Sequence, residues 1–385
     1  MRTFTIPGRA LASMILAIAL TGAAQADVTI GVAGPMTGTN AAIGDQFKEG
    51  VEQAVADINA AGGVLGQKFV VSVADDRADP KEGVSVANRF AANGVKFIVG
   101  PANSGVVMAA SEVYQENGIL TILPASTNPE ITERNMWNIF RVCGRDDVQG
   151  SVAGRIIADK FRGKRIAFVH DKTTYGQGLA NETRKAINAK GMTEVLFEGV
   201  NRDDRDFNAL ISKIKSVNAD LVYVGAPYDI AGLIVRQMRD QGVKAPVMSG
   251  DAVASSEFAS IGGPGAEGTL MTYFPDARNN PGNEKIIEAF RKKGYDPQGY
   301  TLYSYASVQI IKQAAEQAKS LDPKKVADVM HSGKVFNTVL GGLSFDRKGD
   351  VSGGGYMVAG KKKDRYVLYV WKKTPDGKLT YFESE

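Results

Sequence analysis

Short runs of β-branched and other apolar residues alternate with helical patterns along most of this chain of 385 residues. In the helical patterns the apolar residues recur every three or four positions, as at Phe47, Val51, Val55 and Ile58. Strands joined by helices over short connections form right-handed βαβ units, and such units build parallel sheets covered by helices. The alternation therefore predicts an α/β protein.

Two series of such units follow one another. We expect the first to have strands at 28–33, 69–73, 97–100 and 119–123, with helices at 47–58, 81–92 and 104–117. We expect the second, after Gly144, to have strands at 165–169, 195–197, 220–225 and 247–249, with helices at 147–161, 177–190, 207–216 and 230–241. A chain of this length exceeds one comfortable core. The sequence predicts two doubly wound parallel-sheet lobes.

The stretch after Pro275 breaks the alternation. It holds helical patterns at 284–293, 303–318 and 324–331, and then Gly-rich, hairpin-like strands between 341 and 382. A third core is not expected from these segments, so they most simply complete the first two. The chain is therefore expected to cross between the lobes more than once.

The first 26 residues have the pattern of a secretory signal peptide. Arg2 and Arg9 form a basic start, residues 11–20 are apolar, and Ala24 and Ala26 are small residues at the two positions that a signal peptidase reads. The alternative, an N-terminal membrane anchor, needs a longer apolar run than this one. We expect a mature protein that begins at Asp27 and works outside the cytoplasm.

Composition excludes several classes of partner. The net charge is +4, and it falls to +2 without Arg2 and Arg9, so neither nucleic acid nor a polyanionic surface is indicated. No later apolar stretch approaches the length of a membrane span. Cys143 is the only cysteine, so no intrachain disulfide can form. It could be a reactive thiol, but a small buried residue is the favoured interpretation.

Few groups suited to catalysis are present. The two histidines, His170 and His331, are far apart, and no G-x-S-x-G elbow accompanies them, so we interpret His170 as a polar loop residue. No metal-ligand spacing occurs, and the G-x-G-x-x-G match at 263–268 precedes a strand instead of following one. The pairs at 75–76 and 203–204 are interpreted as solvated turn or cap residues. Neither a cofactor nor a metal is expected.

Small polar residues follow several expected strands at the edge where parallel sheets bind ligands. Ser104 follows the strand 97–100 and opens a helix, which suits a carboxylate, although it could be only the helix N-cap. Residues 124–129 place hydroxyl and backbone donors at the same edge. Asp251 follows the strand 247–249 and could receive an ammonium group, or be a cap. Tyr175 and Tyr228 could close over the ligand's apolar part.

At these residues the chain resembles the periplasmic leucine/isoleucine/valine-binding proteins, the amino-acid-binding components of ABC importers. The likeness extends over essentially the whole expected mature chain. Its anchors are residues 44–46, 52–59, 75–76 with 79–81, 124–125, and 169–172 with 175–176. The resemblance implies a type I, Venus-flytrap fold with a three-segment hinge, and lobes formed by 27–145 with 275–353 and by 146–274 with 354–385.

By position, the resemblance assigns the ligand's carboxylate to Ser104, Thr127 and the backbone of Ala125, its ammonium to Asp251 and the lid to Tyr175. Asn103 and Ser126 would add polar groups. The sequence departs from the family in having Asp251 where classical members have glutamate, Ile43 where they have an aromatic residue, and Pro227 where they have tyrosine, which Tyr228 replaces only if the loop shifts. Arg77 and Asn103 occupy their disulfide positions. These departures leave the side-chain preference open.

The function implied is a periplasmic, monomeric, non-enzymatic protein that carries a branched-chain or other small neutral amino acid to an inner-membrane permease with its ATPase subunits. Proline, γ-aminobutyrate or an amide remain open as ligands. Two alternatives use the same residues: the ligand-binding partner of a chemosensory receptor, and a secreted hydrolase with Ser104 or Ser126 and His170.

Overall fold

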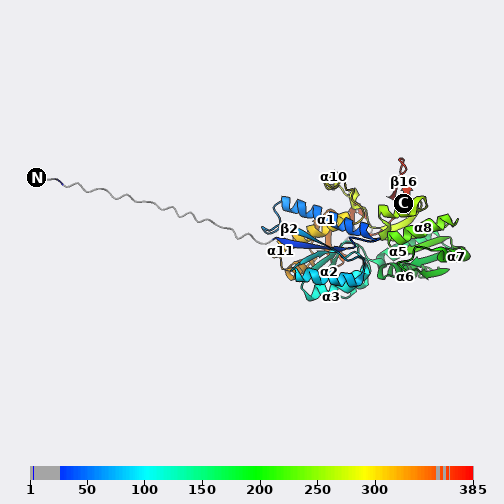
Figure 1. Ribbon diagram of the computed structural model, residues 1–385, viewed down its shortest axis with the longest axis horizontal. Helices are drawn as coiled ribbons and strands as arrows, with labels where there is room; N and C mark the ends of the chain where they lie inside the picture. The colour runs from blue at the N-terminus through cyan, green and yellow to red at the C-terminus, as the bar shows by residue number, and fades with distance from the viewer. Residues whose placement is uncertain (1–2, 4–26, 353–355, 359–360, 364, 385) are drawn as a thin grey trace.

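The computed structural model describes residues 3, 27–352, 356–358, 361–363 and 365–384; the expected signal peptide therefore lies outside the described residues except for Thr3. Two α/β bodies lie side by side, each built around its own sheet (Figure 1). Within the described ranges, no helix is long and apolar enough to cross a membrane.

The first body holds a five-stranded, wholly parallel sheet in the order β2-β1-β3-β4-β5. Its strands are β1 (Val28–Gly34), β2 (Phe69–Asp75), β3 (Phe97–Val99), β4 (Leu120–Leu123) and β5 (Ile139–Arg141). The helices of this part of the chain are α1 (Ala41–Ala60), α2 (Pro80–Ala92), α3 (Ser104–Glu116), α4 (Glu130–Glu133), α10 (Glu284–Lys292), α11 (Thr301–Ala318) and α12 (Pro323–Met330).

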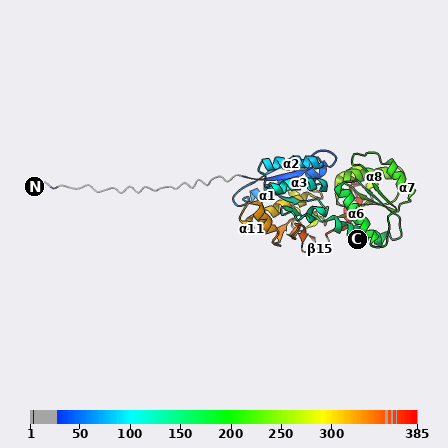
Figure 2. The same ribbon diagram turned by 90° about the horizontal axis from the view of Figure 1, so that it is seen from below.

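Helices cover both faces of this sheet, because successive side chains of β1 point to opposite faces and each face packs against different helices. Ile30 and Val32 belong to the same buried cluster as Phe47 of α1 and Ile310 of α11, whereas Ala33 lies in a cluster with α2 and α3. Figure 2 shows α2 and α3 on the opposite side of the sheet from α11. A strand covered on both faces needs apolar residues on both, as the sequence from Ile30 to Gly34 provides.

The second body holds a seven-stranded sheet in the order β17-β16-β10-β9-β8-β6-β7. The strands are β6 (Ile166–His170), β7 (Leu196–Gly199), β8 (Leu221–Gly225), β9 (Val247–Ser249), β10 (Leu270–Tyr273), β16 (Val367–Lys373) and β17 (Leu379–Glu383). The helices are α5 (Asp146–Lys160), α6 (Thr174–Asn188), α7 (Asn208–Ser216), α8 (Tyr228–Asp240) and α9 (Ser256–Gly262). On β8, Tyr223 packs in a cluster with α5 and α6, and Val222 and Val224 pack with α7 and α8.

The C-terminal stretch completes both bodies, as expected. Helix α11 packs along α1, and β16 joins the second sheet antiparallel to β10 and β17. The second sheet is therefore parallel from β7 to β10, and at its edge β16 runs antiparallel to both of its neighbours, β10 and β17. Short strands make up the remainder: β11 (Phe336–Thr338), β12 (Gly341–Phe345), β13 (Val351–Ser352), β14 (Tyr356–Val358) and β15 (Lys361–Lys363).

The chain passes between the two bodies between β5 and α5, and between β10 and α11. Strand β13 pairs with β12, and β16 belongs to the second sheet, so a further passage lies between Ser352 and Val367. The lobe boundaries expected from the sequence agree with this order of elements but stay a prediction.

Candidate functional site

A cavity lies between the carboxyl-end edges of the two sheets. From the first body it is lined by α1, the loop after β3 and the loop after β4; from the second, by the start of α6 and the loops after β8 and β9. The lining residues are Ile43, Ala102, Asn103, Ser104, Ala125, Tyr175, Pro227, Asp251, Ala252 and Tyr300. Its free volume is about 30 Å³, so the cavity is narrow.

Five of the eight residues predicted for the site line this cavity: Asn103, Ser104, Ala125, Tyr175 and Asp251. They come from positions up to 148 residues apart in the sequence, between Asn103 and Asp251. Ser104 is the first residue of α3, and its Oγ accepts a hydrogen bond from the Asn128 amide at 3.4 Å. Asn103 does not cap α3 with its side chain, and its buried Oδ1 has no partner among the described residues.

The other three predicted residues are buried close to the cavity without lining it. The Ser126 hydroxyl donates to the carbonyl oxygens of Pro101 and Ala102 at 2.8 and 2.9 Å, so it joins two loops of the first body. Thr127 is completely buried. Tyr228 accepts a hydrogen bond from the Ala42 amide at 3.3 Å, across to the start of α1. Their roles in binding a ligand stay predictions.

Asp251 is the anionic group of the cavity. It is 1% exposed, and each carboxylate oxygen accepts a tyrosine hydroxyl: Oδ1 from Tyr175 at 3.0 Å and Oδ2 from Tyr300 at 2.7 Å. Burial raises the pKa of this carboxyl above its usual 3.8, and the two hydroxyl donors oppose that rise. A cationic ligand group would relieve the cost of keeping this charge buried.

Tyr300 and two alanines, Ala102 and Ala252, are lining residues that sequence reasoning missed. Tyr300 immediately precedes α11, and its amide donates to Gln46 Oε1 of α1 at 2.8 Å, so it belongs to the first body. Its hydroxyl nevertheless contacts Asp251 of the second body. The only local signal was its place beside an expected core helix, which does not distinguish it from a core tyrosine.

Direct hydrogen bonds hold the two bodies together around the cavity. Asn40 Nδ2 donates to Asp229 Oδ1 at 3.0 Å, and Asn128 Nδ2 donates to the Thr174 carbonyl at 2.9 Å. With the Tyr300–Asp251 bond, these contacts describe a closed arrangement of the two bodies.

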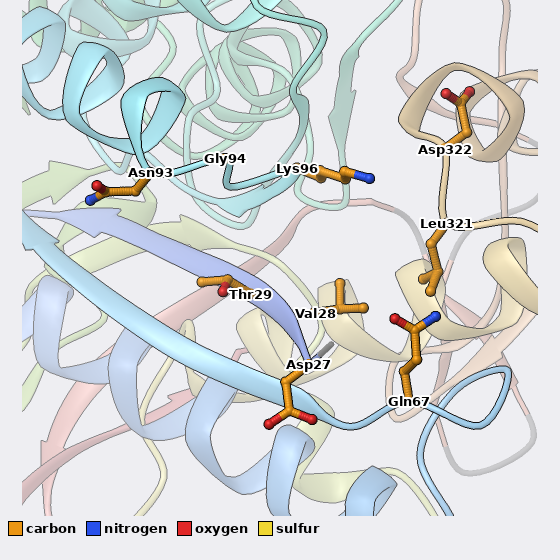
Figure 3. A pocket seen from close by; sticks show the side chains of 9 residues that line it. All are labelled: Asp27, Val28, Thr29, Gln67, Asn93, Gly94, Lys96, Leu321 and Asp322. Carbon is orange, nitrogen blue, oxygen red and sulfur yellow. The ribbon is translucent and has the colours of Figure 1, made fainter. Parts of the chain in front are cut away.

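A larger recess, of about 480 Å³, lies at the opposite edge of the first sheet. Figure 3 shows its side chains, which come from the start of β1, the turn before β3 and the segment before α12, and include Lys96 and Asp322. Ligands of open parallel sheets bind at the carboxyl ends of the strands, whereas this recess lies at the amino ends. The narrower cavity is therefore the candidate site.

The groups considered for catalysis do not meet in the cavity. The expectation that His170 is a loop residue is wrong. It is the buried last residue of β6, and its Nδ1 accepts a hydrogen bond from the Lys172 amide at 3.1 Å. Burial lowers its pKa. His170 is absent from the cavity lining, so it does not complete a triad there with Ser104. Among the residues that the structure covers, no cluster could hold a metal ion.

Two further expectations can be compared with the structure. Cys143 is buried, as expected. Asp76, which directly follows β2, is a turn residue as expected, since it accepts from the Ala78 amide, but it is completely buried and not solvated; burial raises its pKa to about 7. Asp204 is the turn residue that was expected, since it accepts from the Asn201 amide.

Comparison with known proteins agrees with this architecture. The model of a periplasmic binding protein family matches residues 27–364. The Leu/Ile/Val-binding protein homolog 1 of Brucella melitensis is 51% identical over 383 residues, covering 100% of both chains. An amino acid binding protein of Pseudomonas aeruginosa is 47% identical, covering 90% of this chain and 91% of that one.

Among solved structures, a leucine binding protein of Thermotoga maritima superposes with a TM-score of 0.81 at 27% identity, covering 92% of this chain and 97% of that one. The branched-chain amino acid transporter substrate binding protein of Streptococcus pneumoniae, in complex with isoleucine, gives 0.79 at 25% identity, covering 93% and 100%. These likenesses confirm the expected type I fold. With a family model that spans most of its length and relatives of about half-identical sequence covered from end to end, the chain belongs to the periplasmic binding protein family.

Proposed function

We propose that this protein binds a free amino acid between its two lobes and delivers it to an ABC importer. The observation that carries the proposal is the placement of Asp251, a buried carboxylate on one lobe, across a cavity from Ser104 and the loops after β3 and β4 on the other. The ammonium group would pair with Asp251, and the carboxylate would accept from Ser104 and the backbone at Ala125 and Thr127. The relatives named for leucine, isoleucine and valine, and the solved complex with isoleucine, support this ligand class.

Closure of the lobes provides the selectivity in this proposal. A buried charge without a partner costs several kcal/mol, so a molecule lacking either charged end is rejected. Ile43, Ala102, Pro227 and Ala252 form an apolar part of the wall, which suits a small aliphatic side chain.

The cellular part of the proposal follows from the family. The chain is exported to the periplasm by residues 1–26, binds its ligand as a monomer without catalysing a reaction, and docks on an inner-membrane permease whose ATPase subunits supply the energy. Export is tested by N-terminal sequencing of the protein recovered from the periplasm, which should begin at Asp27.

A thermal-shift screen tests ligand binding. A ligand that binds only the folded state raises the melting temperature, by a free energy of about 2.7 kcal/mol at one hundred times its Kd. The screen covers the neutral amino acids, proline, γ-aminobutyrate and the carboxamides of each class. We expect the largest shift from a neutral α-amino acid. No shift from any zwitterion would contradict the proposal.

Replacing Ser104 by alanine should weaken binding by about 1–3 kcal/mol, because the substitution removes a buried hydroxyl donor to the ligand's carboxylate. Isothermal titration calorimetry measures the difference. The matched control is Ser111→Ala, on the same helix: this buried serine contacts Met108 and Arg134 and lies away from the cavity. Equal affinities for wild type and Ser104→Ala would remove Ser104 from the site.

As the solution is acidified, the affinity for the amino acid should begin to fall at a higher pH than it would with an aspartate of ordinary pKa. Burial raises the pKa of Asp251 in the ligand-free protein, and an ammonium ion beside it lowers that pKa again. Binding therefore releases protons in the acid range above pH 3.8, and affinity rises with pH through the pKa of Asp251. Calorimetry at pH 5 and pH 7 in buffers of different ionisation enthalpy counts the protons. Proton uptake on binding at pH 5 would contradict an ionised Asp251 in the complex.

A further inference from the structure

The loop between β4 and α4 has all three of its central carbonyl oxygens occupied. Arg141 Nη1 donates to the Ser126 carbonyl at 3.1 Å and to the Asn128 carbonyl at 2.9 Å, and the Asp146 amide donates to the Thr127 carbonyl at 2.9 Å. The loop is thus held at three consecutive carbonyls.

Three of its amide groups, in contrast, are unused. The amides of Ala125, Ser126 and Thr127 donate no hydrogen bond to any other residue that the structure describes, although all three residues are buried. Buried backbone N–H groups without a partner are rare in folded proteins. Three in succession, beside a cavity that Ala125 and Ser104 line, constitute a set of donors for an anionic ligand group.

The geometry of a trans peptide relates the bonded carbonyl of Ser126 to the free amide of Thr127. The only cis peptide within the described ranges is Gly100–Pro101, so the Ser126–Thr127 peptide is trans. In a trans unit the carbonyl and the amide point in opposite directions. Because the Ser126 carbonyl points to Arg141, the Thr127 amide points away from Arg141.

The guanidinium group of Arg141 is well suited to holding the carbonyls of this loop. Arg141 is the last residue of β5 and is completely buried; its other donors go to Thr132 Oγ1 at 2.5 Å and Asp350 Oδ1 at 2.8 Å. A planar group with five N–H donors can hold two carbonyls, a hydroxyl and a carboxylate at once, whereas a lysine ammonium has three donors from one point. Arg141 does not line the cavity, so any effect on the ligand is transmitted through the loop.

We propose that Arg141 is a positioning residue for carboxylate recognition: by holding the Ser126 carbonyl it orients the free amide of Thr127 toward the ligand's carboxylate, and by holding the Asn128 carbonyl as well it fixes the loop that carries the free amides. The proposal rests on the proposed function and specifies which buried residue prepares its carboxylate subsite.

The test compares each amino acid with its α-carboxamide. The probes are L-leucine with L-leucinamide and L-alanine with L-alaninamide, titrated into wild type, Arg141→Lys and Arg141→Gln. Oriented amides favour the charged carboxylate over the neutral carboxamide. We expect both variants to lower this preference about tenfold, the effect of one displaced charge-assisted hydrogen bond.

The matched control is Arg145→Gln. Arg145 Nη1 also donates to Asp350, at 2.7 Å, but Arg145 donates to no carbonyl of residues 124–129. Its replacement should lower the melting temperature and leave the acid-to-amide preference unchanged. If the Arg141 variants bind acid and amide with the same proportional loss, or with no loss, Arg141 has only a structural role and the inference is wrong.

A measurement on the wild-type protein decides the matter even if both Arg141 variants fail to fold. In ¹H–¹⁵N spectra, the Thr127 amide should move downfield with L-leucine and much less with L-leucinamide. Equal displacement by both would overturn the inference. Absence of binding by every zwitterion in the thermal-shift screen would instead refute the proposed function, so the two failures are distinguishable.

Discussion

Replacing Asp251 by alanine should weaken amino-acid binding by about 3–5 kcal/mol, the cost of leaving one member of a buried charge pair without its partner. This is a loss of roughly two to three and a half orders of magnitude in Kd. The substitution leaves the ligand's ammonium unpaired, and it also removes the acceptor of the Tyr175 and Tyr300 hydroxyls. Calorimetry with the ligand that gives the largest thermal shift measures the change.

A suitable control for this variant is Asp171→Asn. Asp171 is also a buried aspartate of the second body, but its Oδ1 accepts only from the Thr173 amide and hydroxyl, within its own turn. It does not line the cavity, so affinity should be retained. An Asp251→Ala protein that is folded and binds as tightly as wild type would show that the ammonium is held elsewhere.

Replacing Asp350 by alanine should lower the free energy of unfolding by about 3–5 kcal/mol, because Arg141 would remain buried without its counter-ion. Asp350 accepts from Arg141 at 2.8 Å and from Arg145 at 2.7 Å, and its side chain is 5% exposed. The control variant is Asp147→Ala. Asp147 also pairs with Arg145, at 2.9 Å, but its side chain is 38% exposed. That control should cost no more than about 1 kcal/mol.

The pH dependence of this effect has a defined sign. Burial alone would raise the pKa of Asp350, but Arg141, Arg145 and Thr132 together hold it below its usual 3.8. A carboxyl whose pKa is lowered by folding stabilises the protein fully above its unfolded pKa, and loses that contribution as pH falls through the folded pKa. Urea unfolding at pH 7 and pH 5 should therefore give the same difference between wild type and Asp350→Ala. A difference that vanishes by pH 5 would contradict the ion pair.

Much of the fold was predictable because most of its strands and helices have a local sequence pattern, although β5 and α9 were not among the elements expected. The run from Ile30 to Gly34 is apolar on both faces, as a strand covered by helices requires, and Pro80 marks the first turn of α2. The cavity was predictable in part because βαβ connections bring the ends of parallel strands to one edge. Ser104 and Asp251 were found from their positions after strands and from the resemblance.

The remaining features depend on contacts between distant segments. Tyr300 reaches Asp251 only because α11 packs against α1, and that packing leaves no local pattern around Tyr300. Asp76 is the turn residue that was expected, but its polar neighbours gave no sign of its burial, which depends on the surrounding fold. The role inferred for Arg141 likewise depends on a partner, Asp350, that follows it by 209 residues.

The sole cysteine offers a practical route to watching this molecule work. Cys143 is 2% exposed, burial raises its thiol pKa far above the usual range, and its Sγ contacts the Ser126 carbonyl at 3.6 Å. A thiol that is neither ionised nor accessible reacts slowly with maleimides. One cysteine engineered at the rim of the cleft would then take up a dye alone, giving a fluorescent reporter of lobe movement without removal of the native residue.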